Sequence, residues 1–165
     1  MSNNKKTETV RFFEAHCSDC NESFAVPLLS DFAYGEFILK TEDGKAFAYM
    51  NAIIEKSFEL ISKLVKEISQ SENSKELRPD HSFSSGDLNT LHWVIAQCAD
   101  EIGNEKLDNQ FRCPNCGSID VLYGNSVAVR DDEIPVVSFE RFNALVDSEK
   151  KDKVRELYDI GKGLF

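Results

Sequence analysis

The sequence predicts an α+β fold, built from antiparallel β-hairpins, an inserted hairpin, an inserted helical pair and helices near the C-terminal end. Three observations predict it. Two Cys-x-x-Cys pairs, Cys17/Cys20 and Cys113/Cys116, each lie between short apolar segments that are typical of strands. Between the pairs, a strand-like alternation gives way to apolar residues spaced three and four apart, which is the helical pattern. The length of 165 residues suits one domain with its own core.

The segments around the first cysteine pair are expected to be strands. Residues 1–9 are polar and lack an apolar signal segment, so we expect a short disordered tail there. Residues 10–16 then form a strand that runs into the pair, and residues 23–26 form the return strand. Pro27 either ends this return strand or marks it as an edge strand, because proline cannot donate to a β-ladder.

A hairpin is expected after the first cysteine pair. Residues 36–40 and 46–50 both have strand character, and they flank the dipeptide Asp43-Gly44, a strong turn signal. Two helices should follow, joined by a polar loop over residues 69–86 and packed as an antiparallel pair.

The first helix is predicted over residues 51–69, with Asn51 as its N-cap. The second is predicted over residues 87–102, with Gly103 as its stop. The residues expected on the buried faces of the two helices are Ile54, Phe58, Ile61, Val65, Ile68, Leu88, Leu91, Ile95, Cys98 and Ile102.

The C-terminal third should return to strands and end in helices. Residues 109–112 and 119–123 flank the second cysteine pair as strands, and residues 134–137 form a further short one. Ser138 is expected to cap a helix that carries Phe139, Phe142, Leu145 and Val146, and a last helix is expected over residues 148–160.

The four paired cysteines are the candidate metal ligands. Two residues between cysteines allow one tight turn to present both sulfurs to one ion, and four thiolates complete the tetrahedron that suits zinc. Pro114 fixes φ in the second turn, Gly117 supplies the positive φ that should follow, and Asn21 takes the equivalent place in the first turn. Two redox-active pairs and a four-cysteine iron site are the alternatives.

These residues resemble the zinc ribbon group, whose members pair two Cys-x-x-Cys knuckles on short hairpins. The resemblance covers residues 11–26 and 109–123, and it departs from compact ribbons because 92 residues separate Cys20 from Cys113. We therefore expect one domain over residues 10–165, with residues 27–108 inserted between the ribbon halves and a helical segment over residues 138–160. With all four positions filled by protein, the resemblance implies a structural Zn²⁺ with no open position for catalysis.

Charge gives the main indication of a partner. The chain has a net charge of −10, which disfavours nonspecific contact with nucleic acid and with anionic membranes. Acidic residues dominate between Glu14 and Lys45, around the first cysteine pair, and would favour a basic partner or serve only solubility. No apolar run is long enough to cross a bilayer, and we expect a cytoplasmic protein.

Three functions remain open from the sequence. The first is a noncatalytic, acidic protein-interaction module, such as an inhibitor or immunity-type protein for a basic partner. The second is nucleic-acid binding, with Arg112, Arg130 and the Lys150 cluster contacting phosphates and with Phe111 and Tyr123 stacking on bases.

The third function is an enzyme that uses His81 or His92, although neither has a partner at motif spacing. His16, next to Cys17, either neighbours the metal or replaces a ligand. Cys98 is expected to be a buried, inert thiol.

Overall fold

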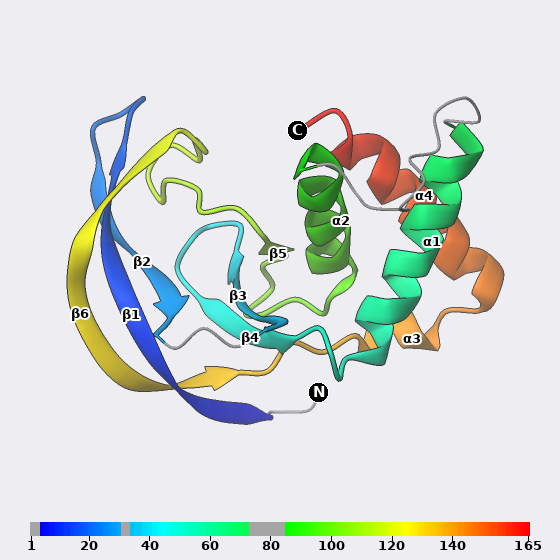
Figure 1. Ribbon diagram of the computed structural model, residues 1–165, viewed down its shortest axis with the longest axis horizontal. Helices are drawn as coiled ribbons and strands as arrows, with labels where there is room; N and C mark the ends of the chain where they lie inside the picture. Colours follow the sequence, from blue (N-terminus) through cyan, green and yellow to red (C-terminus); the bar gives the residue numbers. More distant parts are fainter. Residues whose placement is uncertain (1–3, 31–33, 73–84) are drawn as a thin grey trace.

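The computed structural model describes residues 4–30, 34–72 and 85–165, and it confirms the α+β class (Figure 1). In this part of the chain, two three-stranded antiparallel sheets lie on one side of the molecule and four helices on the other. The elements follow in the order β1 (Lys5–Cys17), β2 (Ser23–Leu29), β3 (Glu36–Thr41), β4 (Phe47–Asn51), α1 (Lys56–Glu72), α2 (Ser85–Cys98), β5 (Leu107–Asp108), β6 (Val121–Pro135), α3 (Glu140–Ala144) and α4 (Asp147–Gly161).

The first sheet has the order β2-β1-β6, with β1 in the centre. The expected tail over residues 1–9 is wrong for residues 5–9, which belong to β1. They pair with the C-terminal end of β6, from Lys5 opposite Pro135 to Thr9 opposite Asp131. Residues 5–9 are polar and give no strand signal of their own. They form a strand because their backbone pairs with a segment far along the chain.

The second sheet has the order β4-β3-β5, and its β3–β4 hairpin confirms the one expected from Asp43-Gly44. Gly44 has φ of +71°, and the Asp43 carboxylate accepts hydrogen bonds from the Thr41 hydroxyl and the Lys45 N–H. The strand expected over residues 109–112 is wrong. Pairing with β3 ends at Asp108, whose side chain accepts the Gln110 N–H and turns the backbone away.

The first helix begins later than expected, at Lys56. Asn51 is not its N-cap, because Asn51 ends β4 and its side chain accepts the Ile53 N–H in a separate turn. Ile54 is consequently 76% exposed instead of buried. Of the rest of the predicted stripe, Ile61, Val65 and Ile68 are buried as expected, whereas Phe58 is only partly buried.

The second helix is shorter than expected and ends at Cys98. Ile102 therefore lies outside the helix, and the positive φ of Gly103 belongs to a turn closed by the Ile102–Glu105 bridge. Leu88 is exposed, whereas Leu91, Ile95 and Cys98 are buried as expected. Of the loop expected over residues 69–86, residues 73–84 lie outside the described residues, and residues 69–72 continue α1.

The expected cap at Ser138 is also wrong. The Ser138 hydroxyl donates to the carboxylate of Asp100, and this carboxylate accepts the N–H groups of Glu140 and Arg141 at the start of α3. A side chain from the segment after α2 thus satisfies the free N–H groups of α3. The final helix expected over residues 148–160 is confirmed as α4.

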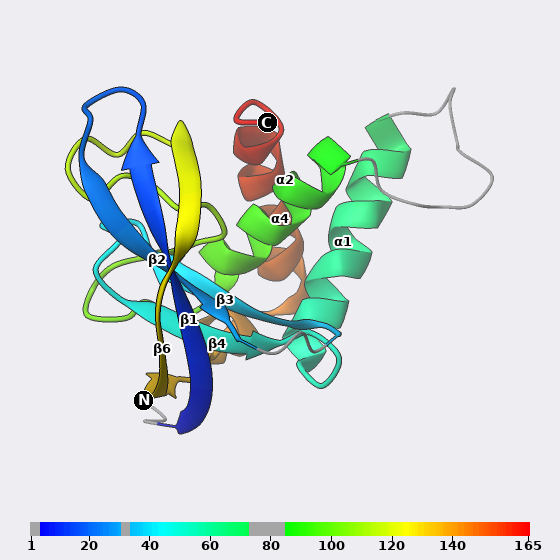
Figure 2. The same ribbon diagram turned by 60° about the vertical axis from the view of Figure 1, so that its left-hand side comes forward.

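The main core lies between the second sheet and the helices. α4 contacts both α1 and α2, which themselves pack together and run in opposite directions (Figures 1 and 2). A smaller cluster of Val10, Phe12 and Ile38 joins the two sheets, where the rings of Phe12 and Phe47 meet edge to face. None of the helices in the described ranges has both the length and the apolar character needed to cross a membrane.

Candidate metal centre

The two cysteine pairs lie on turns with the same backbone hydrogen bonds. In the first turn, the Cys17 N–H donates to the Glu22 carbonyl at 2.9 Å and the Asn21 N–H donates to the Cys17 carbonyl at 3.0 Å. The second turn repeats both bonds at the same spacing. This repetition explains why two residues between cysteines give equivalent structures in unrelated surroundings.

In the second turn, the Cys113 N–H donates to the Ser118 carbonyl at 2.8 Å and the Gly117 N–H to the Cys113 carbonyl at 2.9 Å. The residue after each second cysteine has a positive φ, 62° at Asn21 and 75° at Gly117, as expected from the sequence. Nothing lies within 4 Å of a Cβ placed on Gly117, so backbone conformation rather than space favours glycine there.

The turns bring the four sulfur atoms into one cluster. The Sγ atoms of Cys17, Cys20, Cys113 and Cys116 all lie within 4.8 Å of one another. The separation is 3.6 Å from Cys17 to Cys116 and 3.5 Å from Cys20 to Cys113. A tetrahedral zinc with Zn–S bonds of about 2.3 Å requires sulfurs about 3.8 Å apart, so the cluster suits a structural metal such as zinc.

Further contacts hold the two turns at the same end of the first sheet (Figures 1 and 2). The Ser18 N–H donates to the Asp120 carbonyl at 2.9 Å, and Cys17 pairs with Val121 where β1 meets β6. The β3–β4 turn also reaches this end, because a Cβ on Gly44 would lie 3.5 Å from the Arg112 carbonyl oxygen. The inserted segment therefore contacts the second cysteine turn directly.

The cluster is closed on one side and open on the other. Cys17 is fully buried and Cys113 is 2% exposed, whereas Cys20 is half-buried and Cys116 is exposed. The Asn115 amide donates to the Cys20 sulfur at 3.6 Å. This bond, together with one from the Glu22 N–H, lowers the pKa of Cys20 to about 6 and favours the thiolate, which is the metal-binding form.

The two histidines in the described ranges, His16 and His92, are not part of the cluster. His16 places Nδ1 3.3 Å from the Ser23 hydroxyl, across the β1–β2 pair. His92 packs against the rings of Phe37 and Phe58, and burial lowers the pKa of its imidazole. His81 lies outside the described residues.

Sequence reasoning missed a buried lysine beside the second cysteine turn. Lys40 on β3 is 4% exposed, its ammonium lies over the face of Phe111, and its Nζ has no hydrogen-bond partner in the described chain. Burial lowers the pKa of Lys40 to about 6, against the opposing charge of Asp108. Asp108 is fully buried and accepts the Arg112 Nε–H at 2.6 Å. No sequence pattern distinguishes Lys40 from an exposed strand lysine.

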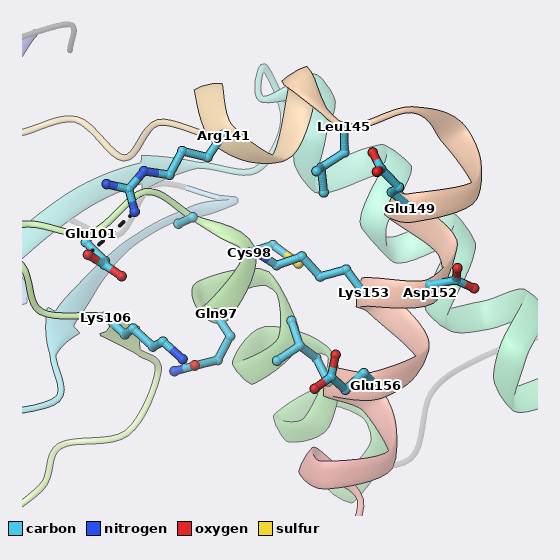
Figure 3. Close-up of a pocket in the computed structure, with 12 residues that line it drawn as sticks. Gln97, Cys98, Glu101, Lys106, Arg141, Leu145, Glu149, Asp152, Lys153 and Glu156 are labelled. Carbon is cyan, nitrogen blue, oxygen red and sulfur yellow. Dashed lines mark ion pairs between the residues drawn. The ribbon is translucent and has the colours of Figure 1, made fainter.

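A cavity of about 530 Å³ lies between the C-terminal end of α2, α3 and α4 (Figure 3). Cys98 lines it, and burial raises the pKa of this thiol to about 12, so that it stays protonated. Charges of both signs surround the cavity, and Glu101 pairs with Arg141 at 3.5 Å. Among the described residues that line the cavity there is no histidine, so none of them gives the Cys98 thiol an imidazole base.

Comparisons of the chain with protein-family models, curated proteins and solved structures found no match. An α+β architecture alone does not determine an activity, which depends on the residues of a site.

Proposed function

We propose that Cys17, Cys20, Cys113 and Cys116 hold one structural zinc ion in a site of the zinc ribbon kind. The observation that carries this proposal is that the four cysteine sulfurs lie within 4.8 Å of one another, close enough to bind one metal ion. Catalytic zinc keeps one position for water or substrate, and four cysteine ligands leave none. The zinc stabilises the fold and takes no part in a reaction.

Zinc at this place would join both ends of a long insertion. Cys17 and Cys20 lie between β1 and β2, whereas Cys113 and Cys116 precede β6. The hairpin, α1, α2 and β5 all lie in the chain between these pairs. Metal binding in small zinc modules contributes on the order of 10 kcal/mol to folding, which is enough to decide whether the domain folds.

We propose that the protein is a noncatalytic, acidic module that binds a basic protein, as an inhibitor or immunity-type protein does. The net charge of −10 supports this function. Exposed acids border the metal site, with Glu14, Asp19 and Glu22 near the first turn and Asp120 near the second. Four thiolates around one Zn²⁺ leave a further net negative charge at the same place.

The test is affinity capture from the native host at low salt, followed by elution with rising salt. The variant Asp19→Asn/Glu22→Gln removes charge beside the metal, and Asp152→Asn/Glu156→Gln removes the same charge from α4. We expect one basic protein that elutes with salt, is lost by the first variant and is kept by the second. The absence of any captured protein, or equal capture by both variants, contradicts the proposal.

Nucleic-acid binding is the second candidate, favoured by one contact. The rings of Phe111 and Tyr123 meet edge to face at 6.4 Å beside the second turn, and Tyr123 is exposed, so that its ring is accessible for stacking on a base. The nearby cations are already engaged, since Arg112 pairs with Asp108 and Arg130 with Asp132. Salt-sensitive binding of single-stranded DNA or RNA, lost with Tyr123→Ala, would favour this candidate over the first.

A further inference from the structure

Strand β6 forms a long free edge of the first sheet. It has 15 residues, whereas strands usually have about 5 or 6. In the order β2-β1-β6 it has one neighbour, and Figure 1 shows it along the outer side of the molecule, opposite the helices. Across the described chain, no backbone group from Val121 to Glu133 has a backbone hydrogen-bond partner outside β1.

The other sheet edges have features that limit further pairing. β2 has seven residues, contains Pro27 and contacts β3. β5 has two residues, and β4 contacts β6. Natural edge strands are protected by shortness, proline, charge or cover. Between Val121 and Val129, β6 has no proline and no charge.

The side chains of β6 divide into an apolar half and an acidic half. Leu122 is 62% exposed and Val127 is 59% exposed, and Tyr123 and Val129 are also exposed. Beyond them, the run from Asp131 to Glu133 has three consecutive acids. Asp132 pairs with Arg130, Glu133 pairs with Lys5 at 3.9 Å, and Asp131 accepts the Thr9 hydroxyl, yet Asp131 and Glu133 stay exposed to a partner. Exposed apolar side chains beside unpaired backbone groups are the usual signature of a strand-addition site.

We propose that the free edge of β6 pairs with an extended segment of another protein, apolar opposite Leu122–Val129 and basic opposite Asp131–Glu133. This inference rests on the proposed function and names the surface and chemistry of its partner. The backbone of the segment would complete the β-ladder, and its basic half would meet the acids. A second copy fits less well, because it presents the same acids and an equal net charge of −10.

Register shifts in the β1–β6 pair restrict how the segment docks. They fall between Phe12 and Ala15 of β1, where β6 has extra residues. Bulges of this kind increase strand twist. A segment that pairs along β6 must therefore follow this added twist at residues 124–127.

The experiment measures fluorescence anisotropy of a labelled peptide of about twelve residues. One half alternates valine with threonine, the other alternates lysine with threonine, and both chain orders are made. A matched peptide is N-methylated at alternate residues, which removes backbone donors but keeps the charge. The protein variants are Val127→Lys on β6 and, as the matched control, Leu28→Lys on β2 at the opposite edge; both positions are exposed.

We expect one chain order to bind, and N-methylation and Val127→Lys each to weaken binding by about tenfold or more, whereas Leu28→Lys has little effect. Hydrogen exchange should then slow within residues 121–133. Absence of binding near about 1 mM peptide, or equal binding of the N-methylated peptide, overturns the proposal.

Two further outcomes distinguish failure of this inference from failure of the proposed function. If the N-methylated peptide binds equally well and Asp19→Asn/Glu22→Gln abolishes binding, the acidic module stands and the β6 edge is not its site. Self-association that Val127→Lys abolishes would instead assign the edge to a second copy and overturn the inference.

Discussion

Asn21 and Gly117 occupy equivalent positions in the two cysteine turns, and both have left-handed backbone conformations, with φ of 62° and 75°. Each donates its N–H to the carbonyl of the cysteine four residues earlier. Asparagine tolerates this conformation better than most residues, but glycine adopts it without steric cost. The first turn therefore has a less favourable residue at this position than the second.

Gly117→Ala should destabilise the protein by about 1 kcal/mol, because a Cβ is strained at this φ. Asn21→Gly should be neutral or slightly stabilising. The measurements are the free energy of unfolding and the metal affinity. Gly103→Ala is the matched control, since Gly103 also has a positive φ, at 60°, but lies away from the cysteines. It should lower stability and leave metal affinity unchanged; equal loss of metal affinity in both variants would contradict the assigned role of Gly117.

Lys40→Met should raise the free energy of unfolding at pH 7 by about 1–3 kcal/mol, because it removes a buried amine without a hydrogen-bond partner. The pKa of Lys40 is about 6 when folded and 10.5 in the ordinary state. Between these values the unfolded chain binds more protons, so the wild-type protein should gain stability as pH rises from 6 to 10. The variant should lose this slope.

The control for Lys40→Met is Lys45→Met in the same hairpin. The Lys45 side chain is exposed, and its ion pair with Asp43 is long, at 3.8 Å. It should change the free energy of unfolding and its pH slope very little. A destabilised Lys40→Met protein would instead mean that the contact with Phe111 and Asp108 outweighs the cost of burial.

Asp100→Asn should destabilise the protein by about 1–2 kcal/mol. Burial opposes ionisation of Asp100, but hydrogen bonds from Ser138 and from the N–H groups of Arg141 and Glu140 outweigh it and hold the pKa below its ordinary value. This stabilisation is present above the ordinary pKa and is lost as pH falls through the lower folded value. As the pH is lowered, the free energy of unfolding should therefore fall less steeply in the variant than in the wild-type protein.

Glu101→Gln is the control for Asp100→Asn, because Glu101 makes only a partly exposed pair with Arg141. It should leave the free energy of unfolding, and its decrease at low pH, nearly unchanged. If the two variants behave alike, the role of Asp100 at the start of α3 is wrong.

Local patterns predicted the features that depend on neighbouring residues. The spacing within each cysteine pair determines its turn, and that is why the positive φ at Asn21 and Gly117 followed from sequence. The Asp43-Gly44 hairpin is equally local. Helical spacing also identified Ile61 and other buried residues of α1.

Features that depend on distant partners could not be predicted in this way. Lys5 to Thr9 are polar and become a strand only because β6 lies beside them. Asp100 acts on the start of α3, 40 residues later. Lys40 is buried because β5 and Phe111 cover it, and nothing in its own segment indicates this.

The proposed zinc site is tested most directly by the metal content per chain, measured together with the thermal midpoint. We expect one zinc per chain, and Cys113→Ser or the exposed Cys116→Ser should lose it and melt about 10 °C lower or more. Cys98→Ser is the control and should keep the metal, because Cys98 lies outside the cluster. Wild-type protein without metal, or a Cys116→Ser variant with full metal content and an unchanged midpoint, would contradict a four-cysteine zinc site.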